Sequence, residues 1–237
     1  MRAFRSLLAP CRGAALIAAP IAALIAGSAP ALAGRLVTPE ESNTKLESAP
    51  LSADPAHPLQ QGWSSFGEPH YGYRLDYPSA WTRGTPQAYG MSLTPPSDRA
   101  SALTSVFILN LPFPTAPASG KPAGKAPAKP QPVSGEKAVT MLADRYLSEL
   151  KAQAPGSKVL RDKPFRWDVG TGVIMGRQIV TEFMREGLPL QQWAVFLPSP
   201  FAPVLHLWQY TATSVEFPQT LDDAEGILNS LKPVAGK

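Results

Sequence analysis

Few residues in this chain have the chemistry for catalysis or metal binding. It has three histidines, His57, His70 and His206, and a single cysteine, Cys11. No two histidines have the His-x-His or His-x-x-x-His spacing of zinc sites, and the cysteine is far from all three in the sequence. His206 lies within an alternating apolar run, which is typical of a histidine in a core or on a sheet face. We therefore expect no metal site.

Motifs for nucleophilic catalysis and nucleotide binding are incomplete. Segment 62–67 (GWSSFG) has two serines between glycines, but the spacing is not that of a nucleophile elbow, and a strand follows instead of a helix. Segment 170–176 (GTGVIMG) has the glycines of a phosphate loop, but β-branched residues follow where a helix must begin. A hairpin turn explains this segment better. We expect no bound cofactor.

Titratable residues form no convincing catalytic set. Asp222 and Asp223 are adjacent, so on a helix their side chains point about 100° apart, which is poor geometry for an acid–base pair. Near a helix N-terminus they would instead be partners of the helix dipole. The one trio that remains is His70, Asp76 and His206. The sequence therefore predicts a protein that is not an enzyme, unless the fold brings these three together.

Aromatic side chains are the remaining signal of binding. If Trp193 and Trp208 share a sheet face, their rings could line a groove for a hydrophobic peptide or a lipid; packing inside the core is the alternative. A strand at the sheet edge is a further docking option, because it can accept an added strand from a partner. The candidate binding surface consists of Tyr71, Tyr73, Arg74, Asp76, Trp193, Trp208 and Tyr210.

Strands must position most of these residues. Residues 70–77 (HYGYRLDY) alternate, with three tyrosines and Leu75 on one face, and Pro78 ends the strand. A short strand is expected over 89–94, where two prolines follow. Residues 103–111 (LTSVFILNL) are apolar at both parities, which is typical of a central strand covered on both faces.

Two helices and four more strands follow. Apolar residues between 139 and 150 form a single helical stripe, with Ser134 as N-cap and Pro155-Gly156 as the stop. The last helix covers about 218–231, with Pro218 in its first turn. The strands are expected at 158–167, 173–185, 191–197 and 204–213, with turns at Gly170/Gly172 and Glu186-Gly187. This order predicts an α+β fold, an antiparallel β-sheet of about six strands with helices packed on it.

The first 33 residues have the pattern of a secretory signal peptide. Three arginines precede an apolar run of 13 residues at 14–26, and Ala31-Leu32-Ala33 offers a cleavage site after Ala33. An uncleaved membrane anchor is the alternative. Cleavage would remove Cys11, which precedes the apolar run and so is misplaced for a lipoprotein. We expect a periplasmic or secreted protein without thiols.

The rest of the chain divides into a flexible lead-in at 34–62 and a single domain at 63–233. A Pro/Ala/Lys-rich insert at 112–133 contains seven prolines and should be a solvated, partly extended linker. A spacer is its simplest role, and contact of its lysines with an anionic membrane surface is the alternative. Without the signal arginines and the insert lysines, 16 basic residues stand against 18 acidic ones. We expect no binding of nucleic acid.

Residues 71–81 (YGYRLDYPSAW) resemble the opening motif of the PsbP/DcrB-like family, an aromatic strand followed by Tyr-Pro and a tryptophan. The ending, with ILNSLK at 227–232, is similar to the final helix of that family, and the order of the other elements matches. The resemblance covers residues 63–233 apart from the insert. It implies an antiparallel sheet flanked by helices and a non-enzymatic binding surface. Members include subunits and assembly factors of photosynthetic complexes, envelope proteins and adaptors of secreted toxins.

Together these observations predict an exported, non-enzymatic binding or accessory protein that acts through protein–protein contacts, with an envelope protein as its partner. The alternative is a carrier of a lipid or another apolar ligand in an aromatic groove.

Overall fold

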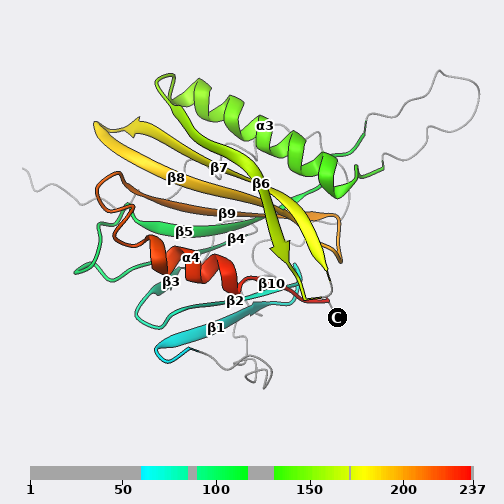
Figure 1. The fold of residues 1–237 in the computed structure, drawn as a ribbon, viewed down its shortest axis with the longest axis horizontal. Coiled ribbons are helices and arrows are strands. Elements are labelled where there is room, and N and C mark those ends of the chain that lie inside the picture. The colour runs from blue at the N-terminus through cyan, green and yellow to red at the C-terminus, as the bar shows by residue number, and fades with distance from the viewer. Residues whose placement is uncertain (1–59, 85–89, 117–130, 171, 236–237) are drawn as a thin grey trace, which may run out of the picture.

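The computed structural model of the chain describes residues 60–84, 90–116, 131–170 and 172–235. These residues form two sheets and two helices, labelled in Figure 1. The larger sheet has seven strands in the order β3-β4-β5-β9-β8-β7-β6, and the smaller has three in the order β1-β2-β10. All neighbouring strands pair antiparallel. The expected α+β class, with helices on an antiparallel sheet, is confirmed.

The larger sheet contains the strands that were expected from residue 89 onwards. The interior strand β5 is buried at both parities, as its apolar sequence predicts, because β4 and β9 flank it and a hydrophobic cluster lies on each of its faces. A short strand at 82–84, which was not expected, pairs with β4. The bounds are β3 (Thr82–Gly84), β4 (Gly90–Thr94), β5 (Ser105–Pro112), β6 (Lys158–Asp168), β7 (Val173–Arg185), β8 (Leu188–Pro198) and β9 (Val204–Thr213).

The smaller sheet corrects the expectation of one continuous sheet. It consists of β1 (Trp63–Glu68), β2 (Tyr73–Pro78) and β10 (Lys232–Pro233), of which only β2 was expected. The strand predicted from His70 begins at Tyr73, because residues 69–72 form a turn. In that turn the N–H of Gly72 donates to the carbonyl of Glu68 at 2.9 Å, and Gly72 has a φ of 71°, which glycine adopts without strain.

Helix α3 (Gly135–Gln153) covers one face of the larger sheet (Figure 1). The side chain of Ser134 accepts a hydrogen bond from the N–H of Lys137, as expected for the N-cap, and the helix ends before Pro155. The predicted stripe is buried against β7, β8 and β9. Burial of its apolar face therefore holds the helix against the larger sheet.

Helix α4 (Leu221–Ser230) and the smaller sheet cover the opposite face of the larger sheet. The helix begins three residues later than expected, and Pro218 lies before it. The reason is a preceding turn, in which the N–H groups of Gln219 and Thr220 both donate to the carbonyl of Glu216 at 2.9 and 3.2 Å. The larger sheet therefore lies between two separate hydrophobic clusters.

The ends of the Pro/Ala/Lys-rich insert lie side by side. Thr115 and Pro132 form an isolated antiparallel bridge, and the N–H of Ala116 donates to the carbonyl of Gln131 at 3.0 Å. Residues 117–130 of the insert, the expected signal peptide at 1–33 and residues 34–59 of the lead-in lie outside the described residues. Within the described part, no helix is long and apolar enough to cross a membrane.

Candidate functional site

The structure separates the predicted binding residues of β2 into two faces. Tyr73 is 2% exposed and its ring packs against Phe66 and His206, so it belongs to the cluster between the layers. Arg74 and Asp76 are half-buried on the opposite face of the strand. Tyr71 lies in the preceding turn, with its ring against that of His70. Of these four, Tyr71, Arg74 and Asp76 have part of their surface open to a partner.

The predicted aromatic residues of β8 and β9 lie together in the core. Trp193 and Trp208 do share a sheet face, and their rings meet edge to face with centroids 5.2 Å apart. Trp208 and Tyr210 are fully buried and Trp193 is 8% exposed. The hydroxyl of Tyr210 donates to the carbonyl of Phe217 at 2.8 Å, which ties β9 to the turn before α4. In this arrangement their surface is used for packing between the layers.

A buried polar cluster joins the two layers around His206. The ring nitrogen Nδ1 of His206 lies 2.8 Å from Oδ1 of Asn110 on β5, while Nε2 has no hydrogen-bond partner. The rings of Tyr73 and Trp167 pack edge-on against the imidazole. Burial lowers the pKa of His206 to about 4, so the ring is neutral at physiological pH.

The trio considered from the sequence, His70, Asp76 and His206, is not brought together. His206 lies between the layers, Asp76 lies on the face of β2 that points away from Tyr73, and His70 is exposed in a turn. The backbone of Asp76 is bound to the end of α4, because its N–H donates to Oγ of Ser230 at 2.8 Å. Among the described residues, no three His, Cys, Asp or Glu side chains group as metal ligands.

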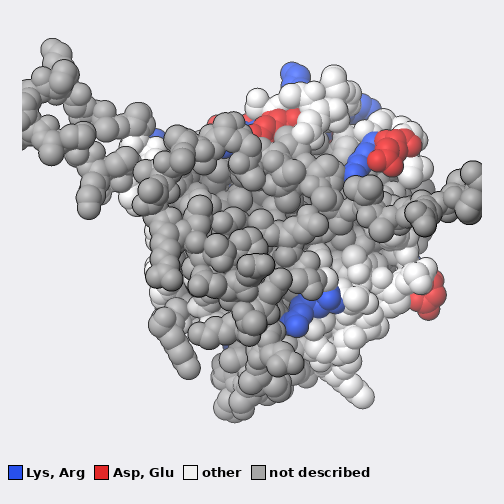
Figure 2. Space-filling view, turned by 180° about the vertical axis from the view of Figure 1, so that it is seen from behind, with Lys and Arg blue, Asp and Glu red and all other residues white. Residues whose placement is uncertain are grey.

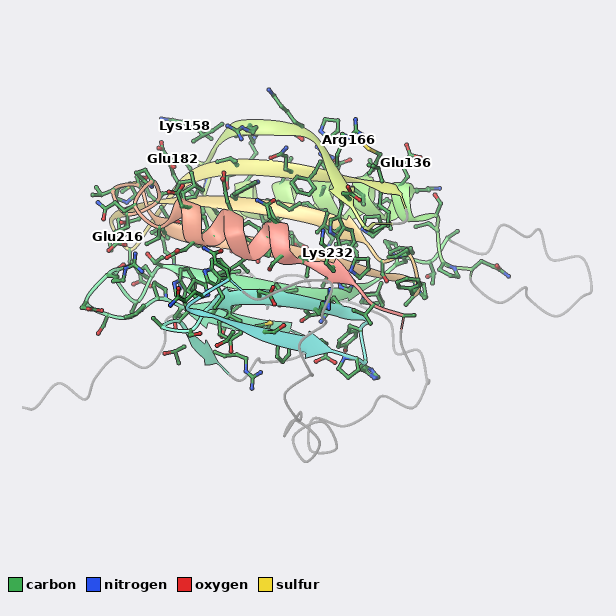
Figure 3. All side chains as sticks on the ribbon, turned by 60° about the horizontal axis from the view of Figure 1, so that its bottom comes forward. Glu136, Lys158, Arg166, Glu182, Glu216 and Lys232 are labelled. Carbon is green, nitrogen blue, oxygen red and sulfur yellow. The ribbon has the colours of Figure 1, made fainter. Side chains whose placement is uncertain are left out.

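The most exposed regular element is β6, at one margin of the larger sheet. It pairs with β7 on its inner side, and no described strand pairs with its outer side. Only Phe165 and Trp167 are shielded, whereas Val159 and Leu160 are 53% and 51% exposed. Figure 3 shows Lys158 and Arg166 towards opposite ends of this margin. A strand with a free edge can bind another extended chain.

Besides its backbone ladder with β7, side-chain hydrogen bonds hold β6 in place. The guanidinium of Arg177 on β7 donates hydrogen bonds to both carboxylate oxygens of Asp162 on β6, at 2.8 and 2.7 Å. It also donates to the carboxylate of Asp144 on α3, at 2.7 Å. Hydrogen bonding to Arg177 holds the pKa of Asp162 below its usual value. At the other end, Nε1 of Trp167 donates to the carbonyl of Leu231 at 2.9 Å. The edge strand is thus connected through Arg177 to α3 on one face of the sheet, and to the residue after α4 on the other.

Sequence reasoning identified β6 as a strand but did not place it at the edge. Two signals for that placement were present. Pro164 lies within the strand, and proline is confined to edges because it cannot donate to a ladder. Lys158 and Lys163 both precede it in the strand, and lysines are a common protection of sheet edges.

Charges on the rest of the described surface are mixed. Seen from behind, basic and acidic side chains lie close together along the upper rim (Figure 2). Several are paired, including Arg99 with Asp223 at 3.6 Å and Arg145 with Glu149 at 2.6 Å. The second pair joins residues one helical turn apart on α3.

No protein-family model and no curated protein matches the sequence. Solved structures do match. Cyanobacterial PsbP from Synechocystis sp. PCC 6803 is similar with a TM-score of 0.49 and 9% identity, over 78% of this chain and 99% of that one. LpqN of Mycobacterium tuberculosis, described as involved in cell envelope biogenesis, matches with a TM-score of 0.44 and 13% identity, over 73% of this chain and 91% of LpqN. The Ran-binding protein Mog1p of Saccharomyces cerevisiae matches with a TM-score of 0.43 and 6% identity, over 73% of this chain and 96% of Mog1p. The likeness concerns the fold alone, and PsbP is among the matches, as the sequence resemblance predicts.

Proposed function

We propose that this protein is an exported, non-catalytic binding protein that acts through protein–protein contacts in the cell envelope, and that the free edge of β6 is its binding surface. Export is supported by the sequence of residues 1–33, with cleavage after Ala33. A non-catalytic role is supported by the positions of His70, Asp76 and His206, which face three different surroundings.

The observation that carries the proposal is the exposure of β6. Nine of its eleven residues are exposed to solvent, on both faces of the strand, although the strand is part of a seven-stranded sheet. Adjacent apolar residues, Val159 and Leu160, are each about half exposed there. The backbone is already extended, so a partner strand would not have to order it.

Site-specific photocrosslinking in cells tests the binding surface. A crosslinking amino acid at Lys163, on the edge, should give one discrete adduct with an envelope protein. The same amino acid at Thr140, exposed on α3, is the matched control and should give none. Equal adducts from both positions, or none from Lys163, would remove the support for β6 as the binding surface.

Export has a separate test. Mass spectrometry of the protein purified from the envelope fraction should give a mature chain that begins at Gly34. A chain that retains residues 1–33 in the membrane fraction would replace the periplasmic form with the anchored alternative. Recovery in the cytoplasm alone would contradict export in either form.

A further inference from the structure

We infer that the partner of β6 is an extended acidic segment of another protein, which adds as a strand along Lys158–Lys163. The inference rests on the proposed function and names the chemistry of its partner. Its starting point is that the two halves of β6 differ. Pro164 has no backbone N–H, so addition of a strand is impeded between Pro164 and Asp168. Every residue of Lys158–Lys163 has a backbone N–H.

The basic residues of this half lie on one face of the sheet. Lys158, Arg161 and Lys163 pair across the ladder with Glu182, Val180 and Gln178, which are alternate residues of β7. Paired residues of an antiparallel ladder point to the same side, and Val180 packs against the cluster on the α4 side. The three cations therefore form a row on the face away from α3, with about 7 Å between alternate positions.

Two of the three cations in this row have no acidic partner among the described residues. These are Arg161 and Lys163, whereas Lys158 has Glu182 at 3.7 Å with 72% of its side chain exposed. Figure 3 shows Lys158 and Glu182 together at one end of the margin. The single acid of this half, Asp162, lies on the other face and is held by Arg177. A strand with acidic residues at alternate positions would face the row directly.

The same features discriminate against other strands. Lysines, a proline and a β-bulge are devices by which sheet edges avoid unselective pairing, and β6 has all three, with its register shift between Val159 and Arg161. A second copy of this edge would oppose cation to cation. An acidic segment is attracted by the charges that repel a second copy, and the exposed Val159 and Leu160 can contact the apolar residues between its acids.

An anionic membrane is the competing occupant. It would be attracted by the row, but it cannot pair with the outer backbone groups of β6, which no described strand pairs. The carboxylate of Glu182, beside Lys158, would also repel it. The free N–H and C=O groups favour a peptide, because only a peptide can satisfy them as a strand does.

The test uses a labelled peptide of alternating glutamate and valine, titrated with the purified protein and followed by fluorescence anisotropy. The peptide should bind, and hydrogen exchange of the Lys158–Lys163 amides should slow when it does. A version with alternate backbone nitrogens methylated keeps the charge and loses strand pairing, so it should not bind. A lysine–valine peptide should not bind either. Equal binding of the methylated peptide would overturn strand addition.

Two arginines of β6 provide matched variants. Arg161→Glu reverses a charge of the row and should weaken binding about fivefold, since it replaces an attractive cross-strand pair with a repulsive one. Arg166→Glu makes the same change beyond Pro164, opposite Met175 on the other face, and should leave affinity unchanged within twofold. Equal losses in both variants would contradict the proposed segment.

The outcomes also separate this inference from the function on which it rests. If the peptide fails to bind while photocrosslinking from Lys163 still gives one envelope protein, the acidic strand is wrong and the binding surface stands. If vesicles of phosphatidylglycerol bind through Arg161 and the peptide does not, the occupant is a membrane and both the inference and the protein–protein role fall. If the crosslinks also fail, the binding surface falls with them.

Discussion

At the scale of single residues, His206 shows how burial controls charge in this protein. Its imidazole is fully buried between the layers, with one nitrogen bound to Asn110 and the other without a partner. No carboxylate is close enough to form an ion pair with it among the described residues. A proton on this ring would therefore be a buried charge without a counter-ion, which is unfavourable in a low-dielectric core.

The free energy of unfolding should depend on pH through His206. Burial lowers the pKa of the folded-state imidazole to about 4, while in the unfolded chain it is near its usual value of 6.5. The unfolded chain therefore binds this proton first, so stability is complete above pH 6.5 and falls as the pH drops from 6.5 towards 4. The shift corresponds to about 3 kcal/mol. Urea unfolding from pH 8 to pH 4.5 measures it.

Two glutamine variants isolate this contribution. His206→Gln removes the buried titration, so its stability should fall less steeply below pH 6.5 than that of the wild type, whatever its stability at pH 8. His70→Gln makes the same change at an exposed turn and is the control. Parallel curves for wild type and His206→Gln would contradict the assignment.

Gly176 on β7 is required by a close approach of two strands. A Cβ at this position would lie 2.4 Å from the carbonyl oxygen of Phe196 on β8, which cannot move without disturbing the ladder. Gly176→Ala should lower the free energy of unfolding by about 1–3 kcal/mol. Gly156→Ala is the control, because a Cβ there meets nothing within 4 Å, and it should change stability by less than about 0.5 kcal/mol. Chemical denaturation of the two variants compares them.

At the scale of elements, the placement of β6 depends on the Arg177 clamp. The planar guanidinium binds both oxygens of Asp162 and also reaches Asp144 on α3, so one side chain connects two strands and a helix. A lysine keeps the charge but cannot reproduce the bidentate geometry. The binding surface proposed for β6 is therefore positioned by a residue outside it.

Arg177→Lys should loosen β6 more than it destabilises the whole protein. We expect a loss of about 1 kcal/mol at pH 7, since the network is partly exposed, and faster hydrogen exchange in Lys158–Asp168. The lowered pKa of Asp162 means that this contribution is present above the unfolded pKa of about 4 and is lost as the pH falls through the folded value. The difference from wild type should then shrink in acid.

Arg99→Lys is the matched control for the clamp. The side chain of Arg99 is 55% exposed and approaches Asp223 with one nitrogen at 3.6 Å. Loss of its planar guanidinium should therefore change the free energy of unfolding by less than about 0.5 kcal/mol. An unchanged exchange rate in β6 of Arg177→Lys would show that the clamp does not hold the strand.

At the scale of the whole molecule, the larger sheet is stabilised from both sides, and the two ends of the insert meet at one place. The two hydrophobic clusters share no residue, and each is closed by a helix from a different part of the sequence. The insert leaves after β5 and returns before α3 at two adjacent points, joined by the bridge between Thr115 and Pro132. The described ends of the insert are therefore already joined to each other.

Replacement of residues 117–130 by a short turn should therefore preserve the fold. Shortening a loop from fourteen to about four residues lowers the entropic cost of closing it, so the free energy of unfolding should rise by about 1 kcal/mol. Thermal and urea unfolding measure the change. A loss of stability would mean that residues of the insert contribute contacts to the folded body.

The Glu216 carboxylate connects distant segments in a way that no local pattern could indicate. It accepts hydrogen bonds from the N–H of Ser101 at 2.8 Å and from the hydroxyls of Ser101, Thr104 and Thr213 at 2.7, 3.1 and 3.0 Å. Burial raises the pKa of Glu216, but these hydrogen bonds outweigh it, so the pKa lies below its usual value. Figure 3 places this residue at one end of the molecule, away from Lys232.

Most helices and strands of this protein can be predicted from the sequence, because their signals are local. The alternation around Leu75, the two-sided apolar run of β5, the stripe of α3 and the turn at Glu186-Gly187 each require only neighbouring residues. Which strands share a sheet, the burial of Trp208 and Tyr210 in the core, and the edge position of β6 could be seen only in the folded structure. Those outcomes depend on pairing between residues far apart in the chain, and the same tryptophan or lysine suits a core, a groove or an edge until its neighbours across the ladder are known.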